Sequence, residues 1–280
     1  MNDILSKVLT QTVQVTLLVL IMMTLVDAVN VWTRGKLATL LKGAGRWRQY
    51  VVASLIGSAP GCVGAFTNVS LYMHGMISFG ALVGAMAAAS GDEAFVMLAM
   101  FPKTAILLFG LLFVVGIVVG WVTDRAVKKW NISTCEDCEM QQFHPTQEGF
   151  VHYLKDHVWQ HIITKHLWKT ALWTLGALMV VEFGLRYWNL EALTSQYTIL
   201  LLLAGALLGL IPESGPHLIF VTMFANGLIP FSVLFTSTFV QDGHGMLPLL
   251  SYSVKDSIKV KAFNLPFGVI FGFILFAFGL

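Results

Sequence analysis

Two short polar stretches interrupt long apolar runs of this chain. Residues 241–245 and residues 90–93 each combine glycine with carboxylate-bearing side chains. In a membrane interior every polar group needs a partner, and glycine loosens a helix, so neither stretch is expected to continue as regular helix. We interpret them as two broken helices that supply the two halves of one binding site. Their side chains with ligand atoms are Ser90, Asp92, Glu93, Gln241, Asp242 and His244.

A third break, residues 212–217, lies between prolines and adds Glu213, Ser214 and His217. Two further acids, Asp27 and Glu182, lie within apolar spans. Lysine and arginine are confined to span ends and loops, so we expect the acids of the apolar runs to lack a basic partner. A charge at the bilayer centre costs about 2.5–3.5 kcal/mol even on a mild scale. Such acids therefore predict a bound cation: a proton, sodium or a divalent metal.

The ligand types favour a borderline divalent metal. Carboxylate with imidazole suits Mn, Fe(II) or Zn, whereas softer metals prefer thiolates. Only Cys62 lies near a break, which argues against a thiol site for copper(I) or arsenite. The predicted metal ligands are Asp92, Glu93, Glu213, His217, Asp242 and His244. Weaker candidates, for contacts to substrate or coupling ion, are Asp27, Glu182, Ser90, Ser214 and Gln241.

Structural roles stay open for the same side chains. Asp242 and His244 could pair with each other or cap broken helices, and the acids of residues 90–93 could cap a helix. Asp27 and Glu182 lie near span ends, where a solvated structural role competes with a place on a proton path.

The composition is that of a membrane protein. Of 280 residues 56% are hydrophobic and 11% are charged, whereas a soluble domain carries about a quarter charged residues. Several apolar runs reach the roughly 20 residues that span a bilayer. The first, residues 8–32, is too long for a signal peptide, contains Asp27 and lacks a cleavage pattern. The net charge of +2 gives no indication of nucleic-acid binding.

The elements that must position the breaks occur twice. At a fixed offset of 152 residues, 60–106 align on 212–258 without a gap. The landmarks in register are Pro60/Pro212, Gly75/Gly227, Gly91/Gly243 and Lys103/Lys255. We predict a first transmembrane repeat over 1–123, a cytoplasmic linker over 124–166 and a second repeat over 167–280.

Charge gives the orientation of the repeats. Basic residues at 34–48 and 125–129 mark cytoplasmic ends, so the N-terminus is expected outside and the second repeat inverted. Inversion requires an odd number of crossings in each repeat, which predicts one re-entrant hairpin per repeat, at Pro60 and Pro212. The predicted fold class is an all-α polytopic membrane protein with two inverted-topology repeats, broken helices and re-entrant hairpins.

The linker is the one long polar segment. Cys135 and Cys138 have metal-ligand spacing, and a predicted amphipathic helix over 151–166 carries histidines. A metal-sensing loop and a solvated helix face are both open interpretations.

Four segments, 57–62, 90–93, 213–217 and 241–245, resemble motifs of the bacterial family of ten-transmembrane heavy-metal exporters, and they follow the same order. Members of that family are also described as arsenic-efflux-like proteins or manganese transporters. The resemblance implies metal export across the bacterial inner membrane. Its ten spans agree with the repeats if the half-helices of re-entrant hairpins are counted as spans.

The leading functional hypothesis is a secondary exporter of a divalent transition metal, Mn-like and driven by proton exchange. No Walker motif is present, and we expect neither enzyme activity nor a permanently bound cofactor, the metal being substrate. The runner-up is a proton- or sodium-coupled exporter of an organic or arsenical solute, and an intramembrane enzyme is a third class. The expected partners are the lipid bilayer, the metal ion and protons, with a homodimer as an open alternative.

Overall fold

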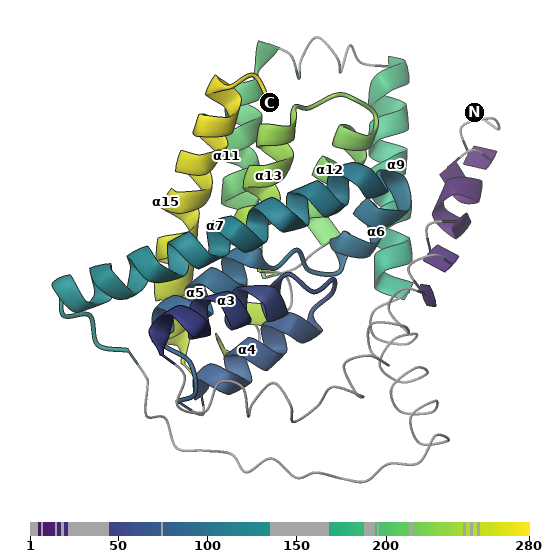
Figure 1. The fold of residues 1–280 in the computed structure, drawn as a ribbon. Coiled ribbons are helices and arrows are strands. Elements are labelled where there is room, and N and C mark those ends of the chain that lie inside the picture. Colours follow the sequence, from purple (N-terminus) through teal and green to yellow (C-terminus); the bar gives the residue numbers. More distant parts are fainter. Residues whose placement is uncertain are drawn as a thin grey trace, which may run out of the picture.

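The computed structural model shows an all-helical chain, with no strand in the part that it describes (Figure 1). The predicted all-α, multi-span fold class is thereby confirmed. The described residues are 5–6, 8–14, 16–17, 20–21, 45–73, 75–134, 168–187, 194, 196–212, 215–242, 245–246, 249–250 and 253–280. Most of the predicted linker, residues 135–166, and most of the predicted first span lie outside them, whereas residues 124–129 of the predicted linker belong to a helix.

Between residues 45 and 134 the chain forms five helices, which begin and end at the turn residues of the sequence. They are α3 (Arg46–Gly57), α4 (Val63–Met73), α5 (Phe79–Ala88), α6 (Glu93–Met100) and α7 (Pro102–Lys129). Ser78 caps α5 by accepting a hydrogen bond from the Ala81 amide, and Pro102 stands at the first position of α7, where its missing N–H costs nothing. The predicted breaks at Pro60 and at residues 90–93 both separate helices.

The second half repeats this order. Its helices are α9 (Trp168–Tyr187), α11 (Thr198–Leu208), a 3-10 turn (Gly215–His217), α12 (Leu218–Ala225), α13 (Phe231–Val240) and α15 (Val254–Ala277). The last helix begins at Val254, so the three lysines that precede the final apolar run, Lys255, Lys259 and Lys261, are helical.

A shift of 152 residues carries one set of helices onto the other. It takes Phe79–Ala88 onto Phe231–Val240 and the first residue of α7 onto the first residue of α15. Gly75 and Gly227 both adopt positive φ, 63° and 70°, and each ends a helix with the same pair of backbone hydrogen bonds. The sequence repeat is therefore a repeat of local structure, with glycine where the left-handed turn requires it.

Glycine also lets helices approach closely. A Cβ on Gly84 of α5 would lie 2.3 Å from the Gly116 carbonyl oxygen of α7, and one on Gly80 would lie 2.3 Å from the Gly120 oxygen. The two helices thus meet backbone to backbone, a geometry that small residues at four-residue spacing allow. The α5–α7 contact is the most extensive between described helices.

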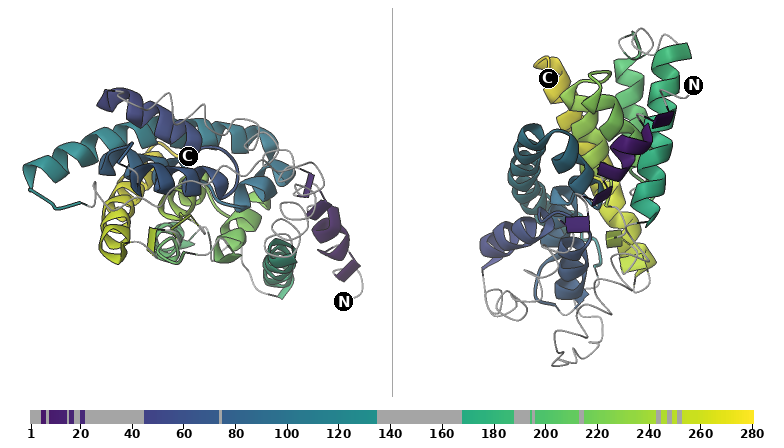
Figure 2. Two further views of the ribbon diagram at one scale, coloured as in Figure 1. Left: turned by 90° about the horizontal axis from the view of Figure 1, so that it is seen from below. Right: turned by 90° about the vertical axis from the view of Figure 1, so that its right-hand side faces the viewer.

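The two halves form two layers, which Figure 2 shows edge-on in its left-hand view. One hydrophobic core contains buried residues of both layers. The rings of Phe101 and Phe224 lie 5.0 Å apart, and Tyr72 donates a 2.8 Å hydrogen bond to Asp256 across the layers. By length and composition, three described helical segments can cross a membrane: Phe79–Met100, Pro102–Lys129 and Val254–Ala277.

Candidate functional site

The two breaks of the first half contact each other. The Gly61 amide donates to the Gly91 carbonyl at 3.1 Å, and the Cys62 thiol donates to Asp92 Oδ1 at 3.1 Å. Asp92 stands at the N-cap position of α6, yet its side chain caps no amide there. The geometry thus ties Asp92 to the neighbouring break and does not support the capping alternative.

The breaks of the second half meet around a lysine. Lys261 Nζ lies 2.6 Å from Asp242 Oδ2 and donates to the carbonyl oxygens of Gly209 (2.6 Å) and Val240 (3.1 Å). Asn264 donates to Asp242 Oδ1 at 3.3 Å. The expectation that Asp242 lacks a basic partner is therefore wrong. Its physical reason is that α15 begins at Val254, which places Lys261 inside the helix that crosses the end of α13.

His217 lies in the same half, at the start of α12. It is fully buried, and its Nδ1 lies 2.9 Å from the Ser237 hydroxyl of α13. The imidazole therefore joins the break before α12 to the helix that leads into Asp242.

The second-half break also touches the first half. A Cβ on Gly245 would lie 2.3 Å from the Ala65 Cβ of α4 and 3.9 Å from the Met86 sulfur of α5. Only glycine fits so close to α4. Gly245 thus lies close to the end of α5, where the break at residues 89–92 begins.

Several buried polar atoms at these breaks have no hydrogen-bond partner among the described residues. They are Ser90 Oγ, both carboxyl oxygens of Glu93, both amide atoms of Gln241, and Asn264 Oδ1. Ser90, Gln241 and Asn264 are fully buried, and Glu93 is 1% exposed. Buried polar groups are ordinarily satisfied, so unsatisfied ones concentrated at helix breaks indicate a place for a ligand or water.

The predicted site residues that the structure describes are Ser90, Asp92, Glu93, His217, Gln241 and Asp242. Their acids are divided between the two halves: Asp92 and Glu93 lie at the first-half break, and Asp242 pairs with Lys261 in the second half. Among the described residues no three His, Cys, Asp or Glu side chains lie together in a way that could hold a metal. The remaining candidates, Asp27, Glu213, Ser214, His244 and the Glu182 side chain, lie outside the described structure, so the ligand set stays a prediction.

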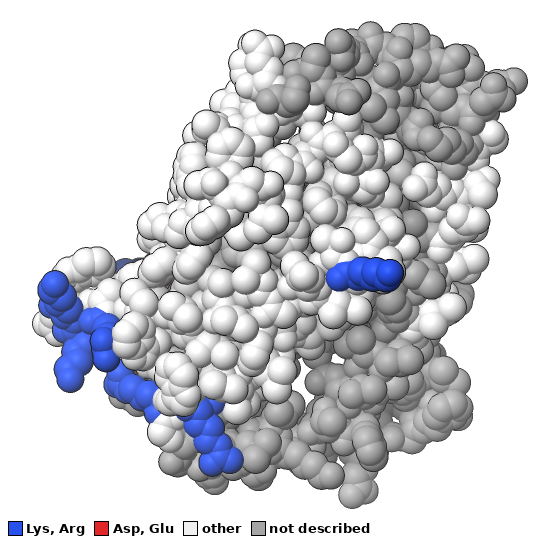
Figure 3. Space-filling view, turned by 45° about the horizontal axis from the view of Figure 1, so that its top comes forward, with Lys and Arg blue, Asp and Glu red and all other residues white. Residues whose placement is uncertain are grey.

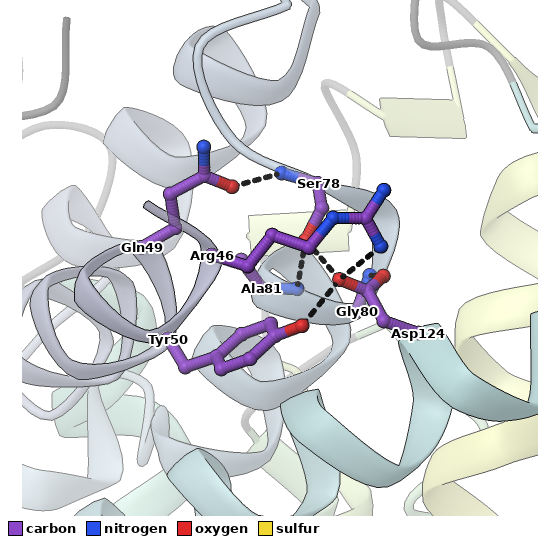
Figure 4. Close-up of polar contacts among 7 residues, drawn as sticks. All are labelled: Arg46, Gln49, Tyr50, Ser78, Gly80, Ala81 and Asp124. Carbon is purple, nitrogen blue, oxygen red and sulfur yellow. Dashed lines mark hydrogen bonds and ion pairs between the residues drawn. The ribbon is translucent and has the colours of Figure 1, made fainter. Parts of the chain in front are cut away.

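Another buried carboxylate, Asp124, which the sequence analysis does not single out, lies away from the breaks (Figure 4). Asp124 accepts hydrogen bonds from Tyr50 (2.7 Å), Ser78 (2.6 Å) and the Gly80 amide (2.7 Å), and Arg46 lies 3.6 Å away. The start of α3, the start of α5 and the end of α7 are thereby held at one place.

Exposed basic side chains surround that place. They are Arg46, Arg48, Arg125, Lys128 and Lys129. Figure 3 shows most of the visible Lys and Arg atoms gathered at one corner of the molecule, a separate basic group on the opposite side, and no acidic side chain on the face shown. The described parts of the two segments predicted to be cytoplasmic, residues 45–48 and 125–129, thus lie together at one end.

These features define a multi-pass membrane protein with buried polar breaks between two repeats. A family model described as "Putative, 10TM heavy-metal exporter" matches residues 1–181 and 152–278, and the chain belongs to this family. No curated protein and no solved structure matches the chain.

Proposed function

We propose that the protein is a secondary active transporter that exports a divalent transition metal, Mn-like, in exchange for protons. The observation that carries the proposal is the set of unsatisfied oxygens at the breaks, above all the two of Glu93 next to Asp92. A divalent ion that leaves water must replace several oxygen ligands within the membrane, and hard oxygen donors suit Mn. Family membership supports heavy-metal export.

The path of α3 and α4 supports a re-entrant hairpin. The end of the molecule that carries Arg46, Arg48 and the basic residues of 125–129 is here called the basic end. The chain leaves it at Gln49 and returns to it at Ser78, whose amide donates to Gln49 Oε1 at 3.1 Å. A pair of helices that returns to its starting end enters the membrane without crossing it. With a hairpin of this kind in both halves, each repeat crosses an odd number of times, as inverted repeats require.

The basic end supports the orientation. Membrane proteins keep Lys and Arg on the cytoplasmic side, so the start of α3 and the end of α7 are assigned to the cytoplasm. The linker over 124–166 follows there, and the N-terminus lies outside the bacterial inner membrane.

Transport by purified protein in proteoliposomes tests the function. We expect an imposed proton gradient to drive Mn²⁺ movement by the full-length protein, and Glu93→Gln to reduce the rate at least about tenfold, because the amide cannot supply an anionic oxygen. Asp124→Asn is the matched control, another buried carboxylate changed to an amide but away from the breaks. Equal rates in Glu93→Gln and the wild type would reject the assigned site.

The alternative substrate class, an organic or arsenical solute, is favoured by one observation. The described residues bring no three metal ligands together. In the same proteoliposomes, gradient-driven movement of arsenite or an organic arsenical without Mn²⁺ movement would select this class over metal export.

A further inference from the structure

We propose that Lys261 is an internal counter-cation, which occupies Asp242 when no metal is bound and yields that carboxylate to the transported ion. The inference rests on the proposed function. In this inference, a lysine on α15 regulates the access of the metal to the Asp242 carboxylate.

The surroundings of Lys261 Nζ are those of a cation site. Three oxygens from two segments of the chain converge on it, at 2.6, 2.6 and 3.1 Å: one from Asp242, one from Gly209 and one from Val240. Gly209 and Val240 stand at the C-terminal ends of α11 and α13. Carbonyls at helix C-termini lack intrahelical donors and carry partial negative charge, so they attract any cation.

The two carbonyls also give the ammonium a second position. If a metal takes Asp242, the lysine keeps Gly209 and Val240 as acceptors and needs only a short side-chain movement. When the metal leaves, Lys261 returns and no unpaired carboxylate stays buried. This matters because a buried charge that has lost its partner is strongly destabilising.

A neighbouring ion pair provides the contrast. Lys259 and Asp256 lie 2.8 Å apart on the same helix, and the Lys259 side chain is 26% exposed against 13% for Lys261. Asp256 also accepts from Tyr72, and Lys259 contacts the Ser133 carbonyl, so this pair lies away from the breaks. It is a matched pair without access to the candidate site.

The first half has no equivalent of the lysine. At the offset of 152, Asp242 corresponds to Ser90 and Lys261 to Phe109. Phe109 therefore supplies no cation to an acid that acts in the first-half break, such as Glu93. The exchange of lysine for metal is thus a property of the second half alone.

Metal binding and transport by Lys261→Met test the inference. The full-length variant lacks the ammonium that competes with the metal for Asp242. We therefore expect tighter binding, with a Kd for Mn²⁺ about tenfold lower or more, because close charge pairs couple strongly. Calorimetry in nanodiscs measures the Kd. Metal release then becomes slower, and the turnover rate in proteoliposomes is expected to fall by a similar factor. Lys261→Arg should restore both values to within about threefold, and Lys259→Met should match the wild type.

A merely structural lysine would weaken metal binding and transport together, and that result, or an unchanged Kd, would overturn the inference. If Lys261→Met does not fold, Lys261→Gln replaces it, because its amide still donates to the Gly209 or Val240 carbonyl. Tighter binding in Lys261→Gln supports the inference, and equal or weaker binding overturns it. If the wild type binds no Mn²⁺, Co²⁺ or Zn²⁺, the proposed function fails first and the inference fails with it.

Discussion

The α5–α7 pair and the α13–α15 pair occupy matching places in the two halves, but their contact surfaces differ. In the first half Gly80 and Gly84 face Gly120 and Gly116, and backbone meets backbone. In the second half the glycines at the matching places of α15, Gly268 and Gly272, face side chains of α13 instead. Those side chains are Val240, Phe239 and Thr236.

The charges follow the same division. Beside the α13–α15 contact Lys261 and Asn264 lie against Asp242, whereas the first-half positions that match Lys261 and Asn264 are Phe109 and Leu112. Where backbone meets backbone, no space is left for a lysine side chain. The first half is therefore packed closely through glycines, whereas the second half packs through side chains and holds a buried ion pair.

The largest expected effect distinguishes the two contacts. Gly84→Ala should lower the free energy of unfolding by at least about 3 kcal/mol, because its Cβ meets a backbone carbonyl that no substitution can remove. Gly272→Ala meets the Thr236 hydroxyl, 1.9 Å from the ideal Cβ, so Thr236→Ala should rescue it in part. Thermal unfolding of the purified variants measures both. Rescue of Gly84→Ala by a side-chain change on α7 would break the comparison.

The two lysine pairs of α15 give the next effect. Lys261→Met should cost about 3–5 kcal/mol of stability, because it leaves Asp242 buried without its cation. Lys259→Met should cost about 1 kcal/mol or less, because its side chain is partly exposed and Asp256 keeps the Tyr72 hydroxyl. Denaturant or thermal unfolding in detergent measures the difference. Equal losses in the two variants would contradict the special position of Lys261.

A smaller loss is expected at the basic end. Asp124→Asn removes a carboxylate that accepts from Tyr50, Ser78 and Gly80, and should cost about 1–3 kcal/mol without changing the Kd for metal. Tyr50→Phe, which removes one of these hydrogen bonds, should cost about 1 kcal/mol. A changed metal affinity in the folded Asp124→Asn variant would show that this end is coupled to the breaks.

The smallest effect concerns metal preference. His217→Ala should weaken Zn²⁺ binding more than Mn²⁺ binding, by a few-fold, because zinc favours nitrogen ligands. Competition titrations of the two metals on one preparation measure the ratio. An unchanged ratio would leave His217 with its Ser237 hydrogen bond as a structural residue.

Much of the fold could be predicted from glycine, proline and repetition. The breaks at Pro60, at residues 90–93 and at Asp242 separate helices because these residues disrupt helix locally, and the offset of 152 predicted matching elements. The four-residue spacing of glycines on α7 recurs on α15 at the same offset, and this visible signal of close packing was missed.

The partners of the buried acids could not be predicted in the same way. Lys261 precedes the last apolar run, so the sequence places it at a span end or in a loop, and only the start of α15 at Val254 shows that it reaches Asp242. Asp124 stands beside basic residues at a helix end, where a solvated carboxylate is the ordinary expectation. Its partner Tyr50 is 74 residues away, so three-dimensional packing alone brings them together.

The central claim is that carboxylates at the helix breaks bind the transported ion. Calorimetric titration of Mn²⁺ into the full-length protein in nanodiscs, wild type against Asp242→Asn, tests it most directly. The asparagine keeps the shape of the side chain and removes its charge, so the account predicts saturable binding to the wild type and at least about tenfold weaker binding to the folded variant. Equal affinity and stoichiometry in the two proteins would contradict it.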